Sequence, residues 1–246
     1  TGKLNYSFAT SSAYQASLVT LTVGTVILLS DRKEEFKIIA GTGSANGFDI
    51  IANSNTTQSA TLIGSKVVNA ENFGTNILAA QAAINYAIAN NATNLNFNGL
   101  ALTGGLLVNG ATKLQINGGG CYITSDTLNI SPFKVTNSSQ LIISNIGAAQ
   151  PLGGSSMINA TAILIVDSEK IFIKDCDVDA TDFNGIQFIN VTKGKISRCD
   201  VDSTTVNPQT IVTSNSSLGI SLLDGTSRVQ ITKNNVARVG IGINLQ

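Results

Sequence analysis

Four regularly spaced aspartates are the residues of this 246-residue chain best suited to chemistry. They form two Asp-Val-Asp triplets, Asp177 with Asp179 and Asp200 with Asp202, whose first residues are 23 positions apart. Two carboxylates about 5 to 5.5 Å apart can act as the acid and the nucleophile of a retaining glycosidase. Like charges at that distance raise the pKa of one partner, so two identical side chains can take opposite roles.

Two other roles compete with catalysis for these aspartates. Carboxylate oxygens are also the ligands that calcium prefers, and Asp182 lies in the adjoining turn, where it could join either arrangement. Aspartate is in addition common in turns, because its side chain caps local backbone groups. Solvated or turn-forming aspartates are therefore the structural alternative to a catalytic or metal-binding group.

A second set of residues could contact a sugar or neutralise its charge. Lys195 and Arg198 could provide the base and the charge-neutralising partner of a lyase, and could equally be ordinary outward residues. Aromatic rings offer flat faces for sugar rings, and Phe172 should point outward because it stands between two inward isoleucines. Phe183 and Phe188 are the only other aromatics that the sequence places near the aspartates, and we expect them in the core or in a subunit interface.

The composition excludes several other chemistries. The chain has no histidine, which excludes imidazole bases, serine–histidine nucleophiles and histidine-bound zinc within it. Fifteen basic and fifteen acidic side chains give a net charge of zero, so we expect no nucleic-acid partner. The longest apolar run, residues 17–29, is interrupted by threonine and glycine and is too short to cross a bilayer. We expect no cofactor and no bound metal.

An internal repeat indicates the elements that must position the aspartates. Three segments share one strand-like pattern: 170–178, 194–201 and 228–236. Three isoleucines correspond within it: Ile173, Ile196 and Ile231. Their spacings are 23 and 35 residues, and the longer one contains a polar stretch, 204–218, that we interpret as an inserted loop.

A period just above twenty, with short strands and glycine turns, predicts a parallel β-helix whose coils stack about 4.8 Å apart. Cys176, Cys199 and Asn234 correspond in the repeat, and we expect all three to point inward, with the amide satisfying backbone groups of a turn. Alternation along each strand then sends the four aspartates outward, each above its equivalent in the next coil. A β-sandwich is the main rival, but it requires no in-register repeat.

The chain divides into three predicted regions. Residues 1–66 form a small β-rich neck or attachment module, residues 67–92 a linker and a capping helix, and residues 93–246 the coils. The last residues, ending at Gln246, alternate like a strand, so we expect further coils in the natural protein and regard the chain as truncated at its C-terminus.

Local patterns supply the elements of the first two regions. The strand candidates are 19–29, 35–40, 48–52 and 60–63, separated by glycine- and asparagine-rich turns. The only convincing helix runs from Ile77 to Asn90, with apolar residues on one face and Thr75 or Asn76 as its N-cap.

Three sequence features complete the pattern: a strand-like stretch at 21–29 followed by 36–39, Phe73-Gly74 followed by the Ala- and Ile-rich stretch 79–84, and the glycine-marked segment 116–120. They resemble the small β module, the capping helix and an early coil of the tailspike branch of the pectate-lyase-like β-helix proteins of bacteriophages. One feature departs from that family, because only Thr75-Asn76 stand where it usually has an Asp- and Gly-rich loop.

The sequence therefore predicts an all-β fold, a right-handed parallel β-helix preceded by a small β module and one capping α-helix. The resemblance implies an extracellular homotrimer in the phage tail, beside other tail proteins, that recognises bacterial surface polysaccharide and cleaves it as a hydrolase or lyase. Two other functions stay open on the same scaffold: a non-enzymatic virion or cell-surface adhesin, and a secreted polysaccharide lyase or epimerase. The active groove could also lie in coils beyond Gln246.

Overall fold

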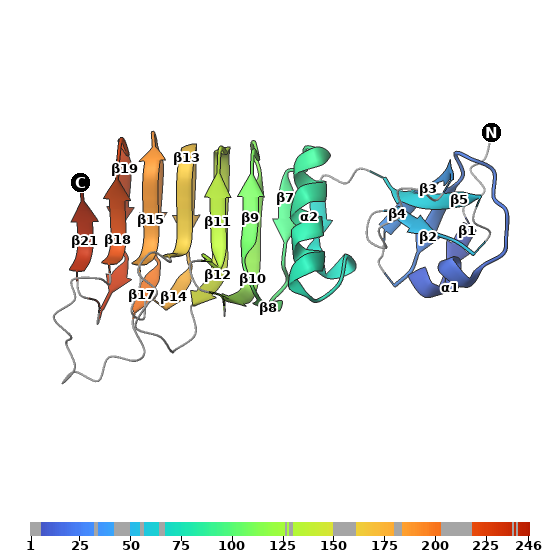
Figure 1. Cartoon of the computed structure of the whole chain (residues 1–246), viewed down its shortest axis with the longest axis horizontal. Helices are drawn as coiled ribbons and strands as arrows, with labels where there is room; N and C mark the ends of the chain where they lie inside the picture. Colours follow the sequence, from blue (N-terminus) through green and yellow to red (C-terminus); the bar gives the residue numbers. More distant parts are fainter. Residues whose placement is uncertain are drawn as a thin grey trace. The chain divides into compact units, whose positions relative to one another are not determined.

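The computed structural model describes residues 6–31, 34–41, 50–54, 57–63, 67–125, 127, 130–149, 161–179, 184–202, 218–237, 239 and 241–246. The chain forms two compact units, residues 1–66 with 72–74, and residues 67–71 with 75–246. The expected architecture, a parallel β-helix together with a small β module and a capping helix, is confirmed (Figure 1).

The smaller unit is a five-stranded sheet with one short helix. The strands in sheet order are β1 (Tyr6–Phe8), β2 (Val26–Leu29), β3 (Glu34–Ala40), β5 (Gln58–Leu62) and β4 (Ile50–Ala52). Helix α1 (Ser11–Ala16) begins after Thr10, whose hydroxyl accepts a hydrogen bond of 2.9 Å from the backbone N–H of Ala13. The helix buries Tyr14, whose ring meets that of Phe8 edge to face with centroids 5.2 Å apart.

Two predictions for this unit were wrong. Helix α1 was not expected, because its six residues are too few to show a helical period. Only the end of the predicted strand at 19–29 forms a strand, since Gly24 takes a φ of +93° and the N–H of Thr25 donates to the carbonyl of Thr22 at 3.0 Å. This turn interrupts a run whose β-branched residues favour a strand.

In the larger unit successive coils add strand segments to three parallel stacks, and the strands of successive coils lie side by side along one axis (Figure 1). The first stack contains β6 (Val67–Asn69), β7 (Asn94–Asn96), the first parts of β10 (Gln115–Thr124) and β12 (Ser139–Ala149), the last part of β13 (Thr161–Lys174), β16 (Gly194–Ser197) and β19 (Val229–Thr232).

The other two stacks follow along each coil. The second contains β8 (Ala101–Thr103), the later parts of β10 and β12, β14 (Asp177–Asp179), β17 (Asp200–Asp202) and β20 (Asn235–Val236). The third contains β9 (Leu106–Asn109), β11 (Phe133–Thr136), the first part of β13, β15 (Asn184–Val191), β18 (Leu218–Leu223) and β21 (Ile241–Leu245).

An isoleucine ladder forms the inner side of the first stack. Its members pair in register from coil to coil: Ile116, Ile143, Ile173, Ile196 and Ile231. The first four are completely buried, and each such side chain contributes about 1.5–3 kcal/mol through the area that it removes from water. The repeat read from the sequence is therefore the inner wall of the coil.

The corner between the first and second stacks is filled by the side chains that the repeat predicted to point inward. Cys176 and Cys199 are free thiols, each only 2% exposed. Asn234 follows in the next coil: its Oδ1 accepts a hydrogen bond from the N–H of Cys199 at 2.9 Å, and its Nδ2 donates to the carbonyl of Ile196 at 3.0 Å. The expected role of the amide in satisfying turn backbone is confirmed.

Helix α2 (Ile77–Ala89) caps the first coil, after the short 3-10 helix η1 (Ala70–Asn72). Asn76 is its N-cap, accepting from the N–H of Ala79 at 2.9 Å. The side chain of Gln81 makes the two hydrogen bonds that a neighbouring strand would make. Its Oε1 accepts from the N–H of Leu107 at 2.9 Å, and its Nε2 donates to the Leu107 carbonyl at 2.8 Å. The helix thereby covers the edge of β9 that faces away from β11 and blocks further strand pairing there.

Candidate functional site

The four aspartates lie on the second stack in the predicted register. Asp177 of β14 is the partner of Asp200 of β17, and Asp179 is the partner of Asp202; these four residues form the aspartate ladder. The valines between them, Val178 and Val201, are completely buried, so alternation turns the carboxylates outward. Neighbouring strands are about 4.8 Å apart, a spacing near that of the carboxyl pair in a retaining glycosidase.

The surroundings of Asp177 raise the pKa of its carboxyl above the ordinary value. Partial desolvation raises the pKa of this carboxyl, and the charges of Asp200, Asp179 and Asp202 raise it further, in that order. Both causes disfavour the ionised form. A carboxyl whose pKa is raised in this way is suited to donating a proton.

Asp200 occupies a different environment one coil further on. Asn235 of β20 takes the next position in the same column, and its Nδ2 donates a hydrogen bond of 3.0 Å to Oδ1 of Asp200. This contact orients the carboxylate through Oδ1, and no residue in the described part of the chain bonds to Oδ2. The two stacked carboxyls thus differ in their surroundings, as an acid and a nucleophile or base must.

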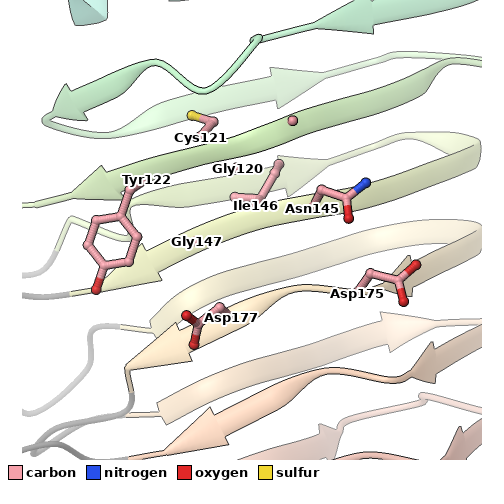
Figure 2. Close-up of a pocket in the computed structure, with 9 residues that line it drawn as sticks. Gly120, Cys121, Tyr122, Asn145, Ile146, Gly147, Asp175 and Asp177 are labelled. Atoms are coloured by element: carbon pink, nitrogen blue, oxygen red, sulfur yellow. The ribbon is translucent and has the colours of Figure 1, made fainter.

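A surface pocket of about 310 Å³ opens beside Asp177 (Figure 2). Its walls are residues 119–122 of β10, residues 145–147 of β12, Asp175 and Asp177. Between Asn117 and Cys121, β10 advances four residues while β12 advances two, from Ser144 to Ile146. The pocket therefore lies where a β-bulge disturbs the otherwise regular coil.

Glycine is required at this bulge. Gly119 and Gly120 take φ values of +58° and +84°, a region that side chains with a Cβ seldom adopt. At Gly118 a Cβ would lie within 3.0 Å of Ile146 Cγ1 and of the Asn145 backbone. The glycine run that the sequence marked as an early coil is thus the feature that forms this wall of the pocket.

Tyr122 is a pocket residue that the sequence analysis missed. It stands in the same outward column as the aspartates, in the order Tyr122, Gly147, Asp177, Asp200. The ring is 41% exposed, and Figure 2 shows it lying across the strand of Gly147 toward the strand of Asp177. Phe172, Phe183 and Phe188 are therefore not the only aromatics near the aspartates.

Phe172 and Lys195 lie on a different face. They are partners in adjacent coils of the first stack, and the corner at Asp175 separates them from the aspartate ladder. Phe172 points outward as expected, with 36% of its surface exposed. Phe188 is completely buried in the third stack, while Phe183 and Asp182 lie outside the described residues.

Arg198, at the same corner, is engaged by a carboxylate. Its Nε and Nη2 donate to the two carboxylate oxygens of Asp175 at 2.6 and 2.7 Å. This bidentate contact holds the pKa of Asp175 below its usual range and engages two of the five N–H donors of the guanidinium. Through its contact with Asp175, Arg198 links two successive coils.

No three histidine, cysteine, aspartate or glutamate side chains come close enough to hold a metal ion in the described part of the chain. Within one strand, Asp177 and Asp179 are separated by an inward valine, which places their carboxylates on neighbouring pleats rather than around one point. The aspartate ladder consists of two carboxylate pairs, Asp177 with Asp200 and Asp179 with Asp202. Pairs suit acid–base chemistry better than calcium binding, which takes about six to eight oxygen ligands around one point.

Comparisons with known proteins support the fold. The chain is similar to the crystal structure of the tailspike protein gp49 of the Acinetobacter baumannii bacteriophage Fri1, a capsular polysaccharide depolymerase, with a TM-score of 0.55 and 10% sequence identity. The match covers 98% of this chain and 62% of the tailspike chain. No protein-family model and no curated protein match the sequence.

At 10% identity this likeness establishes a common fold and transfers no residue role. The chain spans about three fifths of the length of the tailspike that it matches. Neither of the α-helices in the described ranges is long and apolar enough to span a membrane.

Proposed function

We propose that this protein is a phage tailspike segment that binds a bacterial surface polysaccharide on the second stack of its β-helix and hydrolyses it. The observation that carries the proposal is the pocket beside Asp177, where an exposed aromatic ring and a carboxyl of raised pKa share one outward column. The fold shared with a tailspike along 98% of the chain supports the same assignment. Residues 1–66 would serve as the neck or attachment module toward other tail proteins.

The proposed reaction uses the difference between the two stacked aspartates. Asp177 donates its proton to the glycosidic oxygen as the bond from that oxygen to the sugar carbon breaks. Asp200 attacks that carbon or activates a water molecule to do so. In the first route a water molecule then breaks the bond between Asp200 and the sugar, supplies the hydroxyl of the new reducing end and gives its proton to Asp177. In the second route the attacking water supplies that hydroxyl and gives its proton to Asp200, and Asp177 regains a proton from solvent.

A hydrolase agrees with the surroundings better than a lyase. A lyase must neutralise the carboxylate of a uronic acid residue before it removes the adjacent proton. Arg198, the arginine nearest the aspartates in the repeat, already pairs with Asp175, and Lys195 lies on the first stack. The pocket walls include two aspartates and no basic side chain.

The test combines the solution mass of the chain, by light scattering, with an assay for new reducing ends on capsule and lipopolysaccharide preparations. We expect a trimer that releases oligosaccharides, and at least a hundredfold loss of release in Asp177→Asn. Asp224→Asn is the matched control, since Asp224 is an exposed turn residue with a φ of +38°, a region that asparagine tolerates well.

Three outcomes separate the alternatives. A trimer that binds polysaccharide without releasing reducing ends would leave a non-enzymatic adhesin. A monomer that cleaves would indicate a secreted enzyme, and cleavage that gives unsaturated products would indicate a lyase. Equal loss of activity in Asp177→Asn and Asp224→Asn would remove Asp177 from the mechanism.

A further inference from the structure

The ring of Tyr122 can take its position only because the residue one coil further on, Gly147, has no side chain. Tyr122 and Gly147 are partners in adjacent strands. A Cβ at Gly147 would lie within 3.0 Å of Cδ2 and Cε2 of the ring, with the Cε2 separation at 2.9 Å. Any residue other than glycine would therefore displace the ring, which now lies along the column toward Asp177 (Figure 2).

The position of the ring leaves much of it open to a ligand. The side chain is 41% exposed and forms one wall of the 310 Å³ pocket. That volume is at the small end of the range for ligand pockets, about 300–1,000 Å³. An exposed aromatic face beside a small pocket fits one flat, partly apolar ring such as a pyranose.

The charges around the ring have one sign. Burial raises the pKa of Tyr122, and the charges of Asp179 and Asp177 raise it further, so both carboxylates act on the ring. Asp175, the other acidic residue of the pocket wall, is bound by Arg198 at the corner. An anionic group brought onto the ring would meet the charge of Asp179, and that of Asp177 whenever Asp177 has given up its proton, without an unpaired cation among the wall residues; like charges repel.

We propose that Tyr122, kept in position by Gly147, is a stacking subsite for an uncharged sugar ring, and that the aspartates next to it exclude uronic and sialic acid residues from this subsite. The inference rests on the proposed function and names the substrate class of the same site. Tyr122 is a binding residue in this scheme, and Gly147 is a positioning residue that acts through it.

The test uses an array of purified capsule and O-antigen fragments, in which each acidic glycan is also offered after its carboxyl groups have been reduced to alcohols. We expect the neutral and reduced forms to bind at least tenfold more tightly than the acidic forms. Added salt should narrow this gap, because it screens repulsion between exposed charges. Tyr122→Ala should lower the affinity for neutral glycans at least tenfold, and Tyr122→Phe less than twofold.

A double-mutant cycle separates the positioning role of Gly147 from a general effect on folding. Gly147→Ala should weaken glycan binding about as much as Tyr122→Ala, and should have little further effect in the Tyr122→Ala background, where no ring remains to be displaced. Melting temperatures of all variants show whether each is folded. Additive losses of affinity in the double mutant would overturn the role of Gly147.

The remaining outcomes distinguish this inference from the proposed function. Tight binding of an acidic glycan that is lost on carboxyl reduction would overturn the inference and leave the function intact. Unchanged binding in Tyr122→Ala would do the same. Binding of no glycan on the array by the wild-type chain would overturn both.

Discussion

Two outward faces of the β-helix, on either side of the corner at Asp175, present similar chemistry in different settings. The first stack exposes Phe172 above Lys195, and the second exposes Tyr122, Gly147 and Asp177 in one column. Each face therefore offers an aromatic ring and an ionisable group. On the second face the described residues form a pocket that combines the two with a carboxyl of raised pKa.

A backbone irregularity accounts for the difference. In the first stack β13 and β16 pair without interruption, so the outward side chains stand on a regular surface. In the second stack the bulge of β10 and the missing side chain at Gly147 let one ring lie along the column rather than away from it. A regular ladder can repeat a functional group, but a recess on its surface requires a break in the repeat.

The largest expected effect separates the two faces by activity. Asp200 and Lys195 lie in the same coil, one on each face. Asp200→Asn should lower the rate of reducing-end release at least a hundredfold, the low end for loss of an acid–base group. Lys195→Ala should change the rate less than twofold. A large loss in Lys195→Ala with normal activity in Asp200→Asn would move the site to the first stack.

The next effect concerns the stability of the corner that joins the faces. Asn234 points inward and bonds to the backbone of Cys199 and Ile196, whereas Asn235 points outward to Asp200. Asn234→Ala should lower the free energy of unfolding by about 1–3 kcal/mol, because two backbone groups lose their partner. Asn235→Ala should lower it by less than about 0.5 kcal/mol. Denaturant titration of both variants measures the difference, and equal losses would contradict the inward role of Asn234.

The aspartate ladder should itself destabilise the folded chain at neutral pH. The pKa of Asp177 is raised in the folded state, so the group favours folding below its unfolded pKa and loses that contribution as the pH rises through its folded pKa. Asp177→Asn should therefore increase the free energy of unfolding at pH 7 by roughly 0.5 kcal/mol, a value reduced for solvent screening. The gain should vanish below about pH 4, where the unfolded aspartate is protonated as well.

Thermal unfolding of wild type and Asp177→Asn across this pH range tests the sign of the effect. Asp224→Asn is again the control, and its melting temperature should follow that of the wild type. A variant less stable than wild type at pH 7 would mean that the Asp177 carboxylate makes a favourable contact in the folded state.

The regular part of the fold could be predicted because stacking repeats the same residue types. The correspondence of Ile173, Ile196 and Ile231, and of Asp177 with Asp200, is visible in the sequence and matches the observed register. Helix α2 was predictable for a similar reason, because its apolar residues recur with a helical period over three turns and Asn76 is a good N-cap residue.

Tyr122 could not be found in the same way. Two additional residues in the bulge of β10 shift it out of step with the repeat, so aligning the coils by their isoleucines does not bring it above Asp177. The run Gly118-Gly119-Gly120 was the available signal, because three glycines in a strand indicate a bulge or a close backbone approach. The 23-residue repeat also aligns Asp175 with Arg198, so their proximity was visible in the sequence. Their bidentate contact was not, because it depends on rotamers that spacing does not define.

The smallest expected effect tests whether Arg198 belongs to the site or only to the corner. The Asp175–Arg198 pair is exposed to solvent, and exposed ion pairs add little stability. Because the pKa of Asp175 is lowered, any stability that the pair contributes to the fold is present above the unfolded pKa and is lost as the pH falls through the folded value.

Arg198→Ala should leave the melting temperature at pH 7 nearly unchanged, and it should leave Asp175 as a further unpaired charge in the pocket wall. Binding of acidic glycans should then weaken while that of neutral glycans stays constant, whereas an equal loss for both would show that Arg198 contacts the substrate.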